Sequence, residues 1–272
     1  MSIFDVRSHR PVQTWTGHNG AVTALCFRTQ SHQLFSASED RCIRHYNLDE
    51  MLYMETLYGH QFAVTDIDCH RQERPVSVGR DRTVRAWKLA EDSHLIFRGG
   101  AKIQSAQAVS CMKDDWFVTG HEDGHLSLWM AEKKKAVATV DQAHGAGHEV
   151  VSVDALKGSD VVASGSNDGY VRFWKAETGR NLQERGLKPL CRIPVRGYVN
   201  ALAMGPKAKF CVAAIGQEHR SGRWSRIPGA KNRIAIINLH SDALDIADDA
   251  EEKNEEVPVG FESDEESGSE VD

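Results

Sequence analysis

The sequence predicts an all-β protein, a β-propeller in which five blades of four strands each are recognisable. Three observations predict it. Short segments align without gaps at a near-constant spacing, Gly-His pairs precede alternating apolar strands, and tight-turn residues separate the strands. Alternation with a period of two is the pattern of half-buried strands, so repeated alternating runs between turns indicate repeated sheets.

The clearest repeat covers the end of each blade. It reads SASEDRCIRHY (36–46), SVGRDRTVRAW (77–87), TGHEDGHLSLW (119–129) and SGSNDGYVRFW (164–174). Each segment opens on a hydroxyl residue, has aspartate four residues later and ends on an aromatic residue. The aspartates are 41, 42 and 45 residues apart, which matches the period of WD repeats with four strands per blade. With the histidines of the Gly-His pairs, these positions give the expected structural anchors: His18, Ser36, Asp40, Tyr46, His60, Ser77, Asp81, Trp87, Thr119, Asp123, Trp129, Ser164, Asp168 and Trp174.

The anchors predict structure rather than catalysis. In blade 2, His60, Ser77, Asp81 and Trp87 are expected to form one buried hydrogen-bonded chain. A nucleophile would occur once, whereas this set recurs with every repeat, so no enzymatic activity and no catalytic residue are expected. Only blade 2 has the full set: blade 1 has Tyr46 for tryptophan, blade 3 has Gly-Gly at 99–100, and blade 4 has Ala-His at 143–144 before a small insertion.

A fifth blade follows in degenerate form. YVNALAM (198–204), FCVAAIG (210–216) and RIAIINL (233–239) read as its strands, and an insertion at 217–232 replaces the tight turn. The expected propeller spans 1–241, with a stub of a preceding blade at 1–16, blades at about 17–58, 59–100, 101–143, 144–190 and 191–241, and an acidic tail at 242–272.

The start of the chain allows two arrangements. SIF (2–4) fits the end of a third strand and VQTWT (12–16) fits an outer strand. The outer strand could complete the fifth blade and close a five-bladed ring. Alternatively, upstream blades are missing and the chain is part of a larger propeller, since propellers have about 4–8 blades.

Composition indicates a soluble intracellular protein. Of the 272 residues 40% are hydrophobic, no apolar run is long enough to span a membrane, and Met1–Trp15 has no apolar core of a signal peptide. The six cysteines form no C-x-x-C pair, so reduced, mostly buried thiols are expected, and no metal site or cofactor.

Charge is divided between the body and the tail. The segment from Asp242 onward holds fourteen acidic residues against Lys253, which leaves a net charge of +7 on residues 1–241. A basic body suits nucleic acid or acidic protein partners. The acidic tail should be disordered, and Ser263 and Ser269 are candidates for phosphorylation by an acidophilic kinase.

The insertion of the fifth blade carries a resemblance to a known family. GQEHRSGRWSRI (216–227), followed by AKNRIAIINL (230–239), resembles the last blade of the U3 small nucleolar RNA-associated WD-repeat proteins. CRIPVRGYVNAL (191–202), TWTGHNGAVTALCFRTQSHQLFSASEDR (14–41) and ETLYGHQFAV (55–64) are also similar to that family. The similarity covers residues 2–240. It implies a seven-bladed propeller of which this sequence matches the last five blades.

This resemblance implies a non-catalytic component of the U3 small nucleolar ribonucleoprotein, located in the nucleolus of the nucleus. It implies binding to U3 small nucleolar RNA at the box B/C region, beside a kink-turn-binding protein and other proteins of the small-subunit processome. The implied role is processing of pre-18S ribosomal RNA during ribosome biogenesis. No cofactor, membrane or small-molecule substrate is implied.

The insertion also supplies the candidate contact residues. Arginine binds phosphate in a bidentate manner and a loop aromatic can stack on an unpaired base. Because the insertion is long and basic, we expect it to project from one face. The candidates for RNA or partner binding are His219, Arg220, Arg223, Trp224, Arg226, Lys231 and Arg233. The alternative is that Trp224 folds back onto the blade and the arginines pair with acidic groups.

Other basic groups give weaker signals. Lys133, Lys134 and Lys135 are a possible phosphate patch or a solvated turn. Arginines that flank the aspartate turns could form a basic rim; they are Arg41, Arg44, Arg80, Arg82 and Arg85.

A generic protein-interaction scaffold is the alternative function. A ubiquitin-ligase substrate receptor typically carries Trp-Asp-x-Arg at the end of a third strand, but Lys88, Met130 and Lys175 follow the tryptophans here. The same fold would also serve a chromatin-associated propeller.

Overall fold

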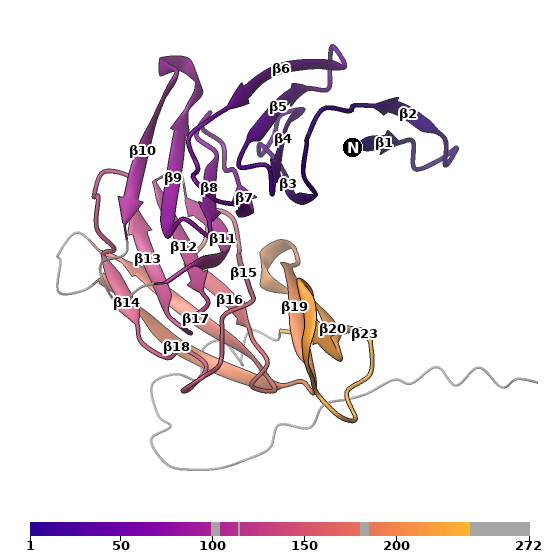
Figure 1. The fold of residues 1–272 in the computed structure, drawn as a ribbon. Helices are drawn as coiled ribbons and strands as arrows, with labels where there is room; N and C mark the ends of the chain where they lie inside the picture. The colour runs from indigo at the N-terminus through magenta and orange to yellow at the C-terminus, as the bar shows by residue number, and fades with distance from the viewer. Residues whose placement is uncertain (99–103, 114, 180–184, 240–272) are drawn as a thin grey trace, which may run out of the picture.

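The computed structural model describes residues 1–98, 104–113, 115–179 and 185–239, and it shows an all-β propeller of five blades (Figure 1). The predicted fold class is therefore confirmed. The acidic segment, with Ser263 and Ser269, lies outside the described residues. Among the residues that are described, no helix is long and apolar enough to cross a membrane.

Four blades are antiparallel sheets of four strands in chain order. Blade 1 consists of β3 (Val22–Phe27), β4 (Gln33–Ser38), β5 (Ile43–Asn47) and β6 (Leu52–Leu57). Blade 2 consists of β7 (Val64–Asp68), β8 (Val76–Gly79), β9 (Thr83–Lys88) and β10 (Ser93–Arg98). Blade 3 consists of β11 (Ala106–Lys113), β12 (Trp116–His121), β13 (Leu126–Met130) and β14 (Ala138–Val140). Blade 4 consists of β15 (Ser152–Ala155), β16 (Val161–Gly165), β17 (Tyr170–Thr178) and β18 (Arg185–Pro194).

Blade 5 has three strands in its main sheet and a hairpin in its insertion. The sheet consists of β19 (Tyr198–Met204), β20 (Phe210–Gly216) and β23 (Arg233–Asn238), and the hairpin of β21 (Glu218–His219) and β22 (Gly222–Arg226). Two short 3₁₀ turns, η1 (Leu89–Glu91) and η3 (Pro206–Ala208), lie in connecting loops.

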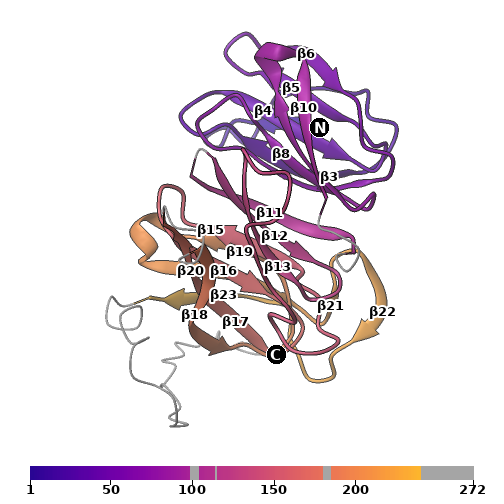
Figure 2. The same cartoon turned by 90° about the vertical axis from the view of Figure 1, so that its left-hand side faces the viewer.

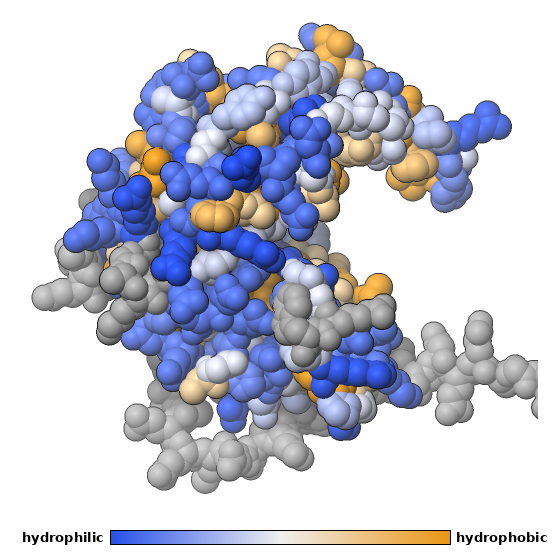
Figure 3. All heavy atoms as spheres, viewed as in Figure 1, coloured by the Kyte–Doolittle hydropathy of each residue, from blue (hydrophilic) through white to orange (hydrophobic). Residues whose placement is uncertain are grey.

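The blades form an open arc rather than a closed ring. Strands β3, β7, β11, β15 and β19 contact one another in this order along the inside of the arc. Strand β2 (Pro11–Thr14) pairs with β1 (Ser2–Phe4) and not with β23, so the five-bladed closure through residues 12–16 is wrong. The opening between this N-terminal hairpin and blade 5 is visible in the ribbon and in the space-filling view (Figures 1 and 3).

The core lies between neighbouring blades. Strand β12 is buried at every position because both faces of its sheet are covered by other blades. Trp129 has no exposed surface and stacks on Phe117 at 6.2 Å, with Phe97 at 6.0 Å in an edge contact. Phe97 belongs to blade 2, so this aromatic cluster joins two blades through apolar contact.

Hydrogen bonds repeat the same connection along the inner strands. A hydroxyl on one inner strand donates to a carbonyl oxygen on the next: Thr23 to Val64 at 2.7 Å, Thr65 to Ala106 at 2.6 Å and Ser152 to Val199 at 2.9 Å. A side chain further along accepts from a backbone N–H of the next blade: Asp68 from Cys111 at 2.8 Å, Ser110 from Ala155 at 3.0 Å and Asp154 from Met204 at 2.6 Å. These bonds satisfy polar groups of the inner strands, which line the inside of the arc. We call the space enclosed by the inner strands the channel.

Lys157 adds a connection that skips a blade. It lies in the loop between β15 and β16, and its Nζ donates to Asp68 Oδ1 at 2.7 Å and to the Cys69 carbonyl oxygen at 2.8 Å. Blade 4 is thus tied directly to blade 2 at the channel.

The anchor residues of blade 2 form the expected chain. Trp87 Nε1 donates to Ser77 Oγ at 2.9 Å, which lies 2.8 Å from His60 Nε2, and His60 Nδ1 lies 2.9 Å from Asp81. Because the Asp81 carboxylate can only accept, His60 Nδ1 carries a proton and donates to it. Blade 1 has the bonds from His18 to Ser36 and Asp40, each 2.8 Å, while Tyr46 packs on Trp15 at 5.0 Å.

Blade 4 corrects the prediction that only blade 2 has the full set. His144 lies 2.9 Å from Asp168 and 2.8 Å from Ser164, which accepts from Trp174 Nε1 at 2.8 Å. The insertion after His144 is looped out, so the shift in sequence spacing leaves the bonds intact.

Blade 3 uses a substitute histidine. Thr119 accepts from Trp129 Nε1 at 2.8 Å and lies 2.8 Å from Nε2 of His121, two residues further along the same strand. Asp123 pairs with His125 at 2.9 Å and accepts from the Gln104 backbone at 3.0 Å. Histidine from the strand end therefore replaces the missing Gly-His pair.

Candidate nucleic-acid interface

The aspartate turns and the histidine loops lie on the same face of the arc. Each His–Asp bond joins a loop that enters a blade to the turn between its second and third strands. We call this the aspartate-turn face. The insertion at 217–232 connects β20 to β23, the equivalent second and third strands of blade 5, so it belongs to this face.

Hydrogen bonds join the two ends of the insertion at its base. Gln217 receives a hydrogen bond from the Ile227 backbone at 2.9 Å, donates from its own backbone to Asn232 at 2.9 Å, and donates from its side chain to the Ala230 carbonyl at 2.6 Å. The β21–β22 hairpin stands apart from the β19–β20–β23 sheet in Figure 2.

Asn200 of the inner strand β19 holds the tip of the hairpin. Its Nδ2 donates to the Glu218 carbonyl at 3.0 Å and its Oδ1 accepts from the Arg220 backbone at 2.9 Å. Tyr198, at the start of the same strand, makes an edge contact with the His219 ring at 5.9 Å and a hydrogen bond with Ser225. The inner strand therefore directs the hairpin toward the channel mouth, on the aspartate-turn face to which the insertion belongs.

His219 and Arg220 are consequently engaged within the protein. His219 is only 5% exposed and faces Glu149 of blade 4 at 3.7 Å. Arg220 is exposed but crosses the channel, and one guanidinium N–H donates to the Gln107 carbonyl of β11 at 2.7 Å. This arginine ties blade 5 to blade 3.

The charges at the channel mouth act on one another. Burial, with the guanidinium groups of Arg220 and Arg80, lowers the pKa of His219 to about 4, so its ring is neutral at pH 7. Burial raises the pKa of Asp66 on β7 to about 6, although Arg220 opposes that rise. Arg220 of blade 5 and Arg80 of blade 2 therefore both act on the His219 ring, although they are far apart in the sequence.

The remaining candidates lie on the outer part of the insertion. Arg226 is exposed and donates to Gln217 Oε1 at 2.7 Å, Lys231 is exposed at the base, and Arg233 opens β23 on the exposed side. The backbone of Arg223 and Trp224 belongs to β22, while their side chains are outside what the structure describes. A polar pocket beside the hairpin is lined by Asn200, Gln217, Glu218, His219, Arg226 and Asn232, with Ile215 and Gly216.

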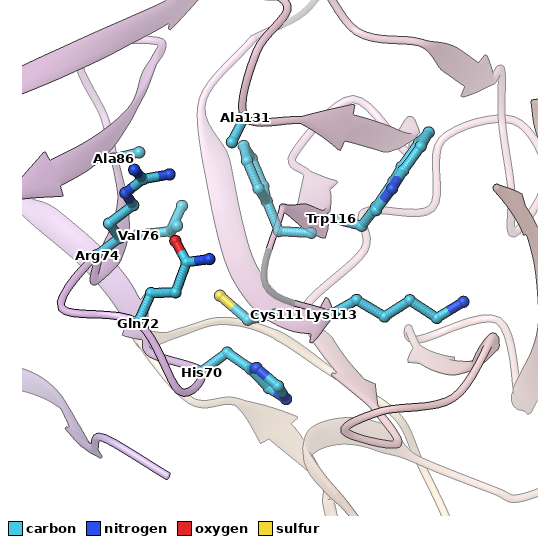
Figure 4. Close-up of a pocket in the computed structure, with 10 residues that line it drawn as sticks. His70, Gln72, Arg74, Val76, Ala86, Cys111, Lys113, Trp116 and Ala131 are labelled. Atoms are coloured by element: carbon cyan, nitrogen blue, oxygen red, sulfur yellow. The ribbon is translucent and has the colours of Figure 1, made fainter. Parts of the chain in front are cut away.

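A second pocket lies between blades 2 and 3, next to the loop that follows β7 (Figure 4). His70, Gln72 and Arg74 line it from blade 2, and Cys111, Lys113 and Trp116 from blade 3. Its volume of about 20 Å³ has room for about one water molecule, so it cannot take a substrate. Within the described part of the chain, no three His, Cys, Asp or Glu side chains are placed to hold a metal ion.

The lysine run lies on the opposite face. Residues 133–135 are in the loop between β13 and β14, and Lys134 and Lys135 are exposed there. They are separated by the height of the blade from the insertion and do not extend its basic surface.

Comparison with known proteins gives consistent matches. The model of the WD domain, G-beta repeat, matches residues 9–47, 52–88 and 136–175. Strands β11 to β13 of blade 3, which lacks the Gly-His pair, are outside these matches, yet the blade has the same four-stranded sheet.

Several curated relatives are similar over most of the chain. A U3 snoRNP-associated protein-like protein of Arabidopsis thaliana is 37% identical over 251 residues, covering 87% of this chain and 51% of the relative. The human U3 small nucleolar RNA-interacting protein 2 is 40% identical over 87% of this chain and 50% of its own length. Ribosomal RNA-processing protein 9 of Saccharomyces cerevisiae is 30% identical over 80% of this chain and 50% of its own length. The chain spans about half the length of these relatives.

Two solved structures share the fold of the arc. The structure of U3-55K aligns with a TM-score of 0.82 and 39% identity, covering 88% of this chain and 74% of the other. The structure of the RRP9 WD40 repeats aligns with a TM-score of 0.83 and 39% identity, covering 88% and 73%.

Proposed function

Because this chain belongs to the family of U3 small nucleolar RNA-associated WD-repeat proteins, which includes U3-55K and RRP9, we propose that it is a non-catalytic component of the U3 small nucleolar ribonucleoprotein. The observation that carries the proposal is the alignment with U3-55K over 88% of the chain, at 39% identity and a TM-score of 0.82. The chemistry of the described residues agrees with a scaffold, since the His, Ser and Asp anchors of blades 1, 2 and 4 bond to one another within each blade.

The proposed ligand is U3 small nucleolar RNA at its box B/C region, together with a kink-turn-binding protein and other processome proteins in the nucleolus. The names of the relatives refer to the U3 particle and to ribosomal RNA processing, which supports this assignment. Residues 1–241 are the proposed binding unit, and Ser263 and Ser269 the proposed phosphorylation sites.

Recovery of RNA with the whole chain tests this function. The tagged chain is immunoprecipitated from its own cells at about 150–300 mM salt, which removes purely electrostatic binding, and the bound RNA is sequenced. Selective enrichment of U3 small nucleolar RNA supports the proposal. Bulk RNA, or none, from a folded chain contradicts it and favours a generic interaction scaffold.

Charge reversal in the insertion is expected to weaken that recovery. Reversal of Arg220, Arg223 and Arg226 together follows from the sequence, but Arg220 also ties blade 5 to blade 3, so its loss would disturb the fold. Arg226→Glu with Lys231→Glu avoids this, because both residues are exposed on the outer part of the insertion. We expect at least a tenfold loss of U3 recovery, since about two phosphate contacts become repulsive.

The matched control reverses the same number of charges on the opposite face. Lys207→Glu with Lys209→Glu changes two exposed lysines in the loop between β19 and β20. Equal loss in both pairs would mean that only net charge matters, and the insertion would not be a contact site.

A further inference from the structure

Two arginines occupy backbone positions that favour glycine. The residue after the turn aspartate has positive φ in four blades: it is glycine in blades 3 and 4, at φ 82° for Gly124 and 89° for Gly169, but arginine in blades 1 and 2, at φ 72° for Arg41 and 59° for Arg82. A side chain with a Cβ is disfavoured there. Both arginines are exposed, and neither guanidinium has a hydrogen bond or an ion pair with another described residue. Both turns therefore present an exposed guanidinium group on the aspartate-turn face.

Aromatic side chains lie beside the arginine turn of blade 2. The Arg80 backbone N–H donates to the Ala63 carbonyl at 3.0 Å, which places the loop at 58–63 against the turn. Phe62 in this loop is 61% exposed and Tyr58 is 72% exposed. The equivalent of Phe62 in blade 1 is Gly20, two residues after the loop histidine, so the aromatic side chain is not part of the repeat's fold.

The turn of blade 2 and the insertion of blade 5 both lie at the channel mouth. Arg80 is exposed at the start of the turn and is close enough to His219 for its charge to lower the pKa of that ring. We define the blade 2 rim as Tyr58, Phe62, Arg80 and Arg82 of blade 2 together with Arg41 on the adjoining aspartate turn of blade 1. The rim and the basic insertion lie on the same aspartate-turn face.

We propose that the blade 2 rim binds a single-stranded segment of RNA, with Phe62 as the platform for an unpaired base and Arg41, Arg80 and Arg82 on the flanking phosphates. This rests on the proposed function and names a second contact surface for the same ligand class. Stacking on an exposed ring requires a base that is free of its neighbours, as in a loop or a single strand. An acidic peptide would use the arginines but would leave the exposed aromatic rings without a role.

Two variants separate the electrostatic contact from stacking. Binding of the full chain to a short fluorescein-labelled single-stranded RNA is followed by anisotropy at several salt concentrations. Arg80→Gln with Arg82→Asn should lower affinity at least tenfold and reduce the slope of log affinity against log salt by about 1.4, since each phosphate contact on a single strand contributes about 0.7. Phe62→Ala should lower affinity about fivefold or more with an unchanged slope, because a lost stack releases no counterions.

Asparagine is chosen at position 82 so that a loss of binding can be told apart from a loss of folding. Asparagine adopts positive φ more readily than arginine, so Arg82→Asn should keep or raise the Tm while binding falls. Lys207→Gln with Lys209→Gln on the opposite face is the matched control and should leave the affinity within about twofold of the wild type, because exposed charges beyond the Debye length are largely screened.

Each other outcome overturns the proposal. Unchanged affinity in the Arg80 and Phe62 variants would show that this surface does not bind RNA; the proposed function would stand if the wild type still recovers U3 RNA. A duplex of the same sequence bound equally well, and equally weakened by Phe62→Ala, would exclude a stacked single strand. If a peptide of residues 242–272 loses binding to the arginine variant while RNA does not, the rim is an acidic-peptide site. Failure of the wild type to bind the labelled RNA would overturn the proposal for the rim alone, because recovery of U3 RNA with the tagged chain tests the proposed function separately.

Discussion

Trp129→Ala should lower the free energy of unfolding by about 3–5 kcal/mol, the range for large aromatic truncations in a packed core. The side chain is completely buried, stacks on Phe117, touches Phe97 of blade 2 and donates its N–H to Thr119. Truncation would leave a cavity between two blades and remove one of the two hydrogen bonds of the Thr119 hydroxyl. A domain is usually stable by about 5–15 kcal/mol, so most of the margin would be lost. Urea unfolding followed by circular dichroism measures the change.

Trp129→Phe separates packing from hydrogen bonding. It keeps most of the ring contact with Phe117 and removes the bond to Thr119, so a loss of about 1 kcal/mol is expected. If the alanine variant lost no more than the phenylalanine variant, the blade 2–blade 3 core would not have the packing described.

Stability should fall as the pH is lowered below about 6.5, and His121 should account for about 2 kcal/mol of that loss between pH 7 and 5. Burial lowers the pKa of His121 to about 4, and burial also lowers the pKa of His144. A histidine with a depressed folded pKa binds fewer protons than the unfolded chain between these two pKa values. Its contribution is therefore complete above the unfolded pKa and is lost as the pH falls toward the folded pKa.

Other groups titrate in the opposite direction, so the test compares two proteins. Burial raises the pKa of Asp66 to about 6, which favours the folded state as the pH falls through that value. This effect is common to the wild type and to His121→Gln, whose amide oxygen can accept from Thr119 as Nε2 does. Urea unfolding at pH 7 and pH 5 should show a smaller pH dependence in the variant, by about 2 kcal/mol. Equal dependence in both proteins would mean that His121 is not protonated differently on unfolding.

The sheets could be predicted because their signals are local. A turn aspartate and an aromatic residue at fixed spacing identify a hairpin wherever they recur, and the strands that flank Asp40, Asp81, Asp123 and Asp168 are where this pattern places them. The histidines of blades 3 and 4 were missed for a different reason. The insertion after His144 shifts its distance from the next strand, and His121 reaches Thr119 from the same strand, a geometry that no sequence spacing of the other blades encodes.

The position of the insertion could not be read from its composition. Arginines and a tryptophan in a long loop suggest an exposed surface, and this holds for Arg226 and Lys231. The direction of the hairpin depends on Asn200 and on the Gln107 carbonyl, which lie far away in the sequence and belong to ordinary strand segments. Only the curvature of the arc brings them to the tip of the hairpin. The exposed Phe62 was likewise overlooked because it follows an anchor histidine without being part of the repeat.

The two contacts that skip a blade change how the arc should open. In a stack whose units contact only their neighbours, each end unit can unfold on its own, and the free energy of local opening is lowest there. Arg220 joins blade 5 to blade 3, and Lys157 joins blade 4 to blade 2. Opening of blade 5 therefore also breaks a bond to the middle of the arc, so blades 3 to 5 should behave as one foldon rather than as three. Amide exchange in β19 should then be nearly as slow as in β11, and the C-terminal end of the arc should resist fraying that a linear repeat would permit.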